Sequence, residues 1–278
     1  MPSLAMGLGL HKQRFVGGGF DADAQAQITR IQNAGGTIED ANIIDADIKF
    51  LKSIGLFNNL KYAVDPRAGI TERVDGSDTF ASKIFDYSGS DADTDNSTGA
   101  EQPKKGVLNG ITALDFDGVN DNLTNTNTVS FLAGAEMFSV AVYSQDFTNS
   151  DNFGMVVEKR SPELDSGKGF GKRFSAIISF DPNVGISSTP YQNVQLVISG
   201  TASTSNLLTG FIDNSQISQR TVSVNYVGKS LGKGRIPSST TEQFAKAQFQ
   251  KNWDFNVLPT VSQAAAIQTY LTNQFNIS

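Results

Sequence analysis

Three aspartates at alternate positions of one polar stretch, Asp91, Asp93 and Asp95, have the spacing closest to a metal site in this sequence. Alternating carboxylates on a loop can converge on calcium, as they do at the start of an EF-hand loop. Asn96 occupies the position where that loop needs glycine, and Gln102 occupies the position of its bidentate glutamate. We therefore expect a solvated acidic loop and no cofactor, with calcium as the open alternative.

A second set of carboxylates, Asp115, Asp117 and Asp121, lies around Gly118. Aspartate beside glycine is first of all a turn former, because its side chain hydrogen-bonds the backbone two residues on. Carboxylates at a loop rim can also bind calcium. A turn is the expected role of this set, and calcium stays open here as well.

The sequence offers little for catalysis. A glycoside hydrolase needs two carboxylates at a controlled separation, one of them with a raised pKa. The pattern E-x-D-x-E, which would place such carboxylates along one strand, does not occur. His11 is the single histidine and there is no cysteine, so a Ser-His-Asp or Cys-His site is not expected. We expect no catalytic residues, although a carboxylate pair assembled from distant parts of the chain stays open.

Tyr191 is the aromatic residue that we expect to be exposed, because it lies within the turn-rich segment STPYQN. An exposed aromatic ring can stack on a sugar. Tyr191 is therefore the candidate carbohydrate-binding residue.

The charge of the chain excludes several kinds of partner. The net charge is −6, and lysine and arginine form no cluster. Nucleic acids and anionic membranes require a basic patch, so neither is expected as a partner. No apolar run approaches the roughly 18–20 residues of a membrane helix, so we expect no membrane insertion. The short apolar run near the start precedes its positive charges, which is the reverse of a signal peptide.

Residues 1–19 are predicted to form an extended arm, because repeated glycines would make a helix costly. The arm nevertheless carries apolar side chains that a purely solvated tail would not need. We expect these side chains to dock on a neighbouring protein; they are Leu4, Met6, Leu8, Leu10 and Phe15.

Residues 20–65 are predicted to form a small helical region that begins after a cap at Asp21 or Asp23. The first helix places Ala24, Ile28 and Ile31 three or four residues apart on one face. The pair of helices is too thin to bury a core alone, so it should pack on the following domain or on a partner.

The second helix of this region is expected to begin with a capping box at Thr37 and Asp40. Its apolar face would be Ile44, Ile48 and Leu51. The residues that follow it could hold one further helical turn before residue 66.

Residues 114–123, LDFDGVNDNL, alternate apolar and acidic side chains and then turn at Gly118. This pattern predicts a half-buried strand and a tight turn into a second strand. It resembles the entry hairpin L-x-FDG-x-x-D-x-L of concanavalin A-like, laminin-G-like jelly rolls. The resemblance implies a mainly β fold, a jelly-roll sandwich over residues 66–278 that ends in a C-terminal helix at residues 260–275.

Period-2 patterns mark the other strands of this sandwich, and a long surface loop is expected after a strand at residues 83–87. Further strands are expected at residues 137–143, 154–159, 173–180, 194–199, 208–212, 221–227 and 243–251.

The order of segments carries a second resemblance. GLGL, FDADAQAQITRIQ and FLKSIGLFNNLKYAV precede the jelly roll, and this order resembles bacteriophage virion proteins with a concanavalin A-like domain. The resemblance implies a non-enzymatic structural protein of the virion, assembled in the host cytoplasm as a tail or baseplate appendage or a capsid decoration. Its partners would be other virion proteins and copies of itself, and contact with host-surface glycan stays open. The alternatives are a glycan-cleaving enzyme or a calcium-dependent lectin on the same scaffold.

Overall fold

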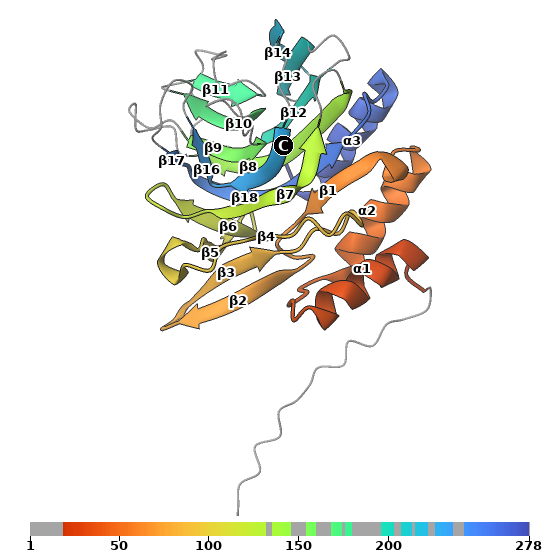
Figure 1. Cartoon of the computed structure of the whole chain (residues 1–278). Coiled ribbons are helices and arrows are strands. Elements are labelled where there is room, and N and C mark those ends of the chain that lie inside the picture. Colours follow the sequence, from red (N-terminus) through yellow and green to blue (C-terminus); the bar gives the residue numbers. More distant parts are fainter. Residues whose placement is uncertain are drawn as a thin grey trace, which may run out of the picture.

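A computed structural model describes residues 19–131, 135–145, 154–159, 168–173, 176–179, 196–202, 207–212, 215–221, 226–235 and 242–277 (Figure 1). Its helices are α1 (Ala22–Asn33), α2 (Ala41–Ser53) and α3 (Val261–Gln274), with 3₁₀ turns at Phe57–Asn59 and Gly99–Glu101. Its strands are β1 (Leu60–Val64), β2 (Ile70–Asp75), β3 (Asp78–Ile84), β4 (Thr94–Asp95), β5 (Lys104–Leu108), β6 (Ile111–Asp117), β7 (Leu123–Phe131), β8 (Met137–Gln145), β9 (Gly154–Lys159), β10 (Lys168–Arg173), β11 (Ala176–Ser179), β12 (Leu196–Ala202), β13 (Leu207–Ile212), β14 (Ser215–Thr221), β15 (Tyr226–Leu231), β16 (Lys233–Arg235), β17 (Glu242–Phe244) and β18 (Lys246–Phe255).

The helical pair forms as its sequence indicates. Asp21 caps α1 by accepting a hydrogen bond from the amide of Asp23, and Ala24, Ile28 and Ile31 are buried. The predicted capping box of α2 is wrong, because Asp40 alone caps that helix. Thr37 forms a β-bridge with Ile70 instead.

The further helical turn expected after α2 is present as the 3₁₀ turn at Phe57–Asn59, and the strand β1 follows it. This strand pairs antiparallel with β18, with Ala63 opposite Trp253. After the 3₁₀ turn the chain enters the large sheet at Leu60, so the sheet begins earlier than the expected start of the sandwich at residue 66.

One long antiparallel sheet folds back on itself to make the sandwich. Its hydrogen-bonded order is β11-β10-β9-β15-β7-β4-β3-β5-β6-β18-β8-β12-β13-β14, with β1 on β18 and β2 on β3. The fold-back brings β11 against β12 and β13, and β9 against β8 and β18. The prediction of a mainly β sandwich is confirmed.

Two apolar cores lie on opposite faces of the layer that contains β8. The interlayer core fills the sandwich and includes Tyr62, Leu114, Phe116, Leu123, Met137, Tyr143, Val156, Leu231 and Phe249. The helix-side core lies under the helices and includes Ile28, Ile31, Ile44, Ile48, Leu51, Val140, Val142, Trp253, Phe255, Ile267 and Leu271. Figure 1 shows α1, α2 and α3 along one side of the molecule. The helical pair therefore packs on the sandwich, as its thin apolar face required.

A β-bulge in β18 exchanges the two faces of that strand. Phe249 pairs with Tyr143 and Lys251 pairs with the next residue, Val142, so Gln250 is the extra residue. Phe249 consequently points into the interlayer core, whereas Trp253 points into the helix-side core.

A cluster of buried charges joins the helices to the sheet. The Nζ atom of Lys251 lies 2.6 Å from Asp47 of α2 and 3.3 Å from Asp65. Asp47 also accepts hydrogen bonds from the hydroxyls of Tyr87 (2.7 Å) and Tyr270 (2.9 Å). The side chains of Lys251, Asp47 and Asp65 are fully buried, so each charge depends on these partners.

The segment after β3 is packed rather than a surface loop. The strand expected at residues 83–87 is displaced, because β3 spans Asp78–Ile84 and therefore begins and ends earlier. The carboxylate of Asp86 is buried and accepts hydrogen bonds from the amides of Ala63, Ser88 and Ala92. These bonds fold the segment around Asp86, so its polar composition misled the sequence prediction.

The C-terminal helix is confirmed. Thr260 and Gln263 form a reciprocal capping box at the start of α3. Two strand predictions are wrong: residues 173–180 span the end of β10 and all of β11, and residues 221–227 span the end of β14 and the start of β15.

Candidate functional site

A row of five cross-strand partners crosses one face of the sheet. Phe80 of β3 lies opposite Lys104 of β5, which lies opposite Asp115 of β6; Asp115 lies opposite Gln248 of β18, which lies opposite Ser144 of β8. Side chains of directly opposed residues point to the same face of a sheet. We call these five residues the cross-strand row.

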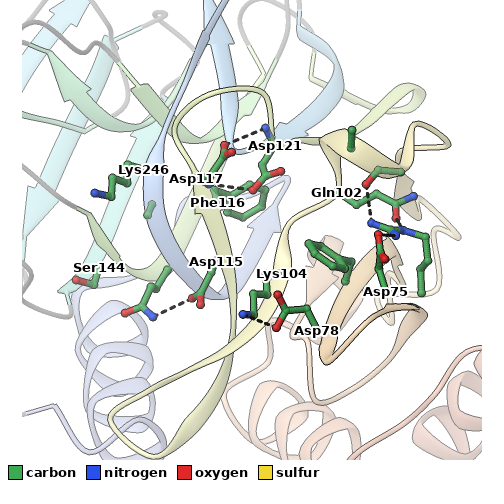
Figure 2. A pocket seen from close by; sticks show the side chains of 16 residues that line it. Asp75, Asp78, Gln102, Lys104, Asp115, Phe116, Asp117, Asp121, Ser144 and Lys246 are labelled. Atoms are coloured by element: carbon green, nitrogen blue, oxygen red, sulfur yellow. Dashed lines mark hydrogen bonds and ion pairs between the residues drawn. The ribbon is translucent and has the colours of Figure 1, made fainter.

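The cross-strand row lines an open cleft of about 790 Å³. Figure 2 shows Ser144, Asp115 and Lys104 along it, with Asp117 and Asp121 at one side. By strand alternation, Ser144 shares the sheet face of Val142, which belongs to the helix-side core. The helices thus cover one part of this face and the cleft occupies another.

Hydrogen bonds and ion pairs fix the side chains of the row. The Gln248 amide donates to Asp115 at 2.8 Å, and Lys104 pairs with Asp78 at 2.7 Å. Burial raises the pKa of Asp115, while the Gln248 hydrogen bond opposes this rise. Ser144 as a whole is 4% exposed, and its hydroxyl has no hydrogen-bond partner among the residues that the structure describes. The row therefore offers a carboxylate, an amide and an unused hydroxyl to a ligand.

Arg73 of β2 closes the far side of the cleft. Its guanidinium donates to Gln102 at 2.7 Å and to the Gly99 carbonyl at 2.7 Å. It also lies over the ring of Phe80, 4.5 Å from the ring centroid. These contacts hold one face of the Phe80 ring against Arg73.

The hairpin turn at Gly118 brings two carboxylates to the rim of the cleft. Asp117 accepts hydrogen bonds from the amides of Val119 (2.7 Å) and Asn120 (3.2 Å), and Gly118 has a φ of 81°. Asp121 accepts one from the Asp117 amide at 2.9 Å. The expected turn role is thus confirmed for Asp117 and Asp121, whereas Asp115 accepts a hydrogen bond from Gln248 of β18 instead. Burial raises the pKa of Asp121 to about 6, and the neighbouring Asp117 carboxylate adds to the rise.

The raised pKa of Asp121 predicts a pH dependence of stability. The unfolded chain has an Asp pKa of about 3.9, so protonated Asp121 favours the folded state and this contribution is lost as pH rises through about 6. Asp121→Asn keeps an oxygen for the Asp117 amide but cannot ionise. Between about pH 4 and pH 7.5, the free energy of unfolding of the variant is expected to rise by about 1–3 kcal/mol relative to wild type. Urea denaturation at both pH values measures this, and parallel pH profiles would contradict it.

The structure does not bring the candidate calcium ligands together. Asp91 and Asp93 both contact Arg30 of α1, at 2.9 Å and 3.2 Å, whereas Asp95 lies 3.7 Å from Lys83. Among the described residues, no three His, Cys, Asp or Glu side chains gather as a metal site. The spacing suggested a common ligand set, but each carboxylate instead faces a cation on another element.

The remaining candidates lie outside the described residues. They are Tyr191 and the arm residues Leu4, Met6, Leu8, Leu10 and Phe15. In the part of the chain that the structure describes, no helix has the length and apolar character to cross a membrane.

Comparison with solved structures identifies the fold. The binding domain of Paraclostridial mosquitocidal protein 1 superposes with a TM-score of 0.53 at 12% identity, over 78% of this chain and 53% of that chain. A botulinum neurotoxin type C structure superposes with a TM-score of 0.54 at 11% identity, over 78% of this chain and 52% of that chain. Trypanosoma rangeli sialidase superposes with a TM-score of 0.53 at 11% identity, over 80% of this chain and 34% of that chain. The chain thus spans about a third to a half of the length of these proteins.

These likenesses show a concanavalin A-like antiparallel sandwich, here with an N-terminal helical pair and a C-terminal helix. The jelly-roll prediction is confirmed. No protein-family model and no curated protein sequence matches the chain.

Proposed function

We propose that this protein is a non-enzymatic structural protein of a bacteriophage virion whose jelly roll binds host-surface glycan in the cleft. The cross-strand row carries the glycan part of the proposal. A sugar presents hydroxyls that both donate and accept, and the row supplies a carboxylate, an amide and an unused hydroxyl within one shallow surface. The virion part is carried by the resemblance of the segment order to bacteriophage proteins.

The structural comparisons support carbohydrate as the ligand class. The botulinum neurotoxin type C structure is described as interacting with two ganglioside molecules, and the sialidase structure contains a difluorinated sugar derivative. Concanavalin A-like folds thus occur in proteins that meet glycans. Function depends on the site rather than the fold. Substitutions of the cleft residues are therefore needed to test whether this chain also binds a glycan.

Attachment to the particle is assigned to the N-terminal arm. The described chain leads from residue 19 into α1, whose apolar side chains belong to the helix-side core. The helices are therefore occupied by internal packing, and the apolar arm is the part left to contact other virion proteins or further copies. Full-length protein carrying Leu8→Asp and Leu10→Asp is expected to lose self-association or particle binding while its unfolding temperature stays unchanged. Equal masses in solution and equal particle binding for variant and wild type would contradict this role.

A glycan array probed with the full chain tests the cleft. Asp115→Ala and Gln248→Ala each remove one ligand-facing group and the hydrogen bond between the two residues. Each variant is expected to bind any recognised glycan at least about tenfold more weakly, equivalent to the roughly 1.4 kcal/mol of one or two lost hydrogen bonds. Gln25→Ala, the same change on the exposed face of α1, is the matched control and should bind as wild type does. Absence of glycan binding, or equal binding by all variants, would overturn the proposal.

A glycan-cleaving enzyme is the second candidate, and one observation favours it. Asp121, with a pKa of about 6, lies beside Asp117 at the rim of the cleft. Against it, the Asp117 carboxylate is held by turn amides rather than directed at a substrate. Product release from the recognised glycan, abolished by Asp121→Asn with binding retained, would establish hydrolysis. Unchanged binding in a calcium chelator is expected and would argue against a calcium-dependent lectin.

A further inference from the structure

A lysine and an aspartate from opposite layers meet inside the sandwich. Lys229 lies on β15 and Asp254 on β18, and the Nζ atom of Lys229 is 2.7 Å from Oδ2 of Asp254. Both side chains are fully buried. Taking a carboxylate and an ammonium out of water is costly even when they are paired. A reaction that removes both charges would relieve that cost.

The surroundings of the pair polarise one oxygen of the carboxylate. The hydroxyl of Ser139 donates to Oδ1 of Asp254, and the side-chain amide of Asn252 lies 3.3 Å from the same oxygen. The ring of Tyr62 lies beside the amine, 4.9 Å from Nζ to the ring centroid. The two donors thus contact one carboxylate oxygen while the amine approaches the other. This is the arrangement that stabilises negative charge on an oxygen during attack at a carbonyl carbon.

Among the described residues, Lys251 is a second fully buried lysine, and it lies in a different part of the fold. Lys251 divides its contacts among Asp47, Asp65 and Gln274, at 2.6 Å, 3.3 Å and 2.7 Å. Asp47 in turn accepts from two tyrosine hydroxyls, so its charge is spread over a wide hydrogen-bond network. That cluster lies under the helices, where polar groups from several elements meet. Lys229 and Asp254 instead lie next to Tyr62 of the interlayer core.

We propose that Lys229 and Asp254 form an intramolecular amide bond that cross-links the two layers of the sandwich. Proton transfer from the ammonium to the carboxylate gives a neutral amine and a neutral acid. The Nζ–Cγ bond then forms and the Cγ–Oδ2 bond breaks. The leaving oxygen departs with two protons that came from Nζ, so the products are one amide and one water molecule. No oxidant, metal or further reactant is required. Ser139 and Asn252 hold the developing charge on Oδ1 and act as positioning residues.

The intact mass of the denatured full-length protein tests the proposal. Formation of the amide lowers the mass of the 29.8 kDa chain by one water, about 18 Da. Proteolysis should yield one peptide in which Lys229 is joined to Asp254. Lys229→Arg keeps a positive charge but is expected to show the full sequence mass, whereas the exposed control Lys49→Arg should keep the deficit of about 18 Da.

Two results would overturn the assignment. A wild-type mass equal to that of the sequence would mean that the pair is an ordinary buried ion pair. A deficit of about 17 Da with Lys229 joined to Asn252 would mean that ammonia left from the neighbouring amide instead. Both results come from the mass of the denatured wild-type protein, so neither requires a variant that folds.

Discussion

Replacing Asp47 by alanine is expected to lower the free energy of unfolding by about 3–5 kcal/mol. The reason is the charge that remains: Lys251 is fully buried, and its closest carboxylate contact is the one to Asp47 at 2.6 Å. The substitution also removes the acceptor of the Tyr87 and Tyr270 hydroxyls. Chemical denaturation followed by circular dichroism measures the loss.

Asp45→Ala is the matched control, two residues earlier on the same helix. Asp45 pairs with the exposed Lys49 at 2.7 Å and accepts a hydrogen bond from the Asp21 amide at 2.7 Å. Its loss leaves no buried charge unpaired, so we expect a cost of about 1–2 kcal/mol. If Asp47→Ala lost no more stability than Asp45→Ala, water would have to reach the Asp47 site. The burial of Lys251 and Asp47 described above would then be wrong.

Replacing Trp253 by alanine is expected to cost about 3–5 kcal/mol as well, through loss of packing. Trp253 is fully buried where β18 meets the helices. Its ring stacks with Phe50 of α2 and Tyr270 of α3, at centroid distances of 6.4 Å and 6.0 Å. Its indole N–H donates to the Tyr87 hydroxyl at 3.0 Å. The same denaturation experiment measures the change.

Trp253→Phe separates packing from the indole hydrogen bond. The smaller ring keeps most of the buried apolar surface, so we expect this variant to lose less than half of what alanine loses. A loss below about 1 kcal/mol for Trp253→Ala would mean that the helices contribute little to the cooperative fold.

The parts of the fold that were predictable depend on patterns within one segment. The hairpin around Gly118 combines a period-2 strand with turn residues only a few positions apart, and its aspartates bond the backbone as expected. The helix α1 likewise displays its cap and its apolar face within a dozen residues. Such local signals need no knowledge of distant partners.

The cleft could not be predicted, because its row is assembled from five strands. Phe80, Lys104, Asp115, Gln248 and Ser144 become neighbours only through strand register. One signal was present: Asp115 was already placed on the outward face of its strand. Lys104 stands opposite it from the adjacent strand β5, but the place of Gln248 depends on a pairing between segments more than 100 residues apart, which no single stretch encodes.

The buried charges were missed for a related reason. A lysine or aspartate is normally exposed, so Asp47 on a helix and Lys251 on a strand were not singled out. Asp47 and Lys251 can both be buried because they pair with each other and because Tyr87 and Tyr270 donate hydrogen bonds to Asp47. Composition cannot reveal such mutual dependence, because the partners are joined only in the folded chain.

The extra residue at Gln250 determines which changes of length β18 can tolerate. Before it, the strand supplies Gln248 to the cleft and Phe249 to the interlayer core; after it, the strand supplies Trp253 to the helix-side core and Asp254 to the interlayer side. Deleting Gln250 itself would leave Phe249 opposite Tyr143 and Lys251 opposite Val142, so both faces would be kept. Deleting Asn252 would instead exchange the faces of the Trp253 indole and the Asp254 carboxylate. The strand β18 therefore keeps its cleft residue and its core residues on their own faces only while the number of residues on each side of the bulge is unchanged.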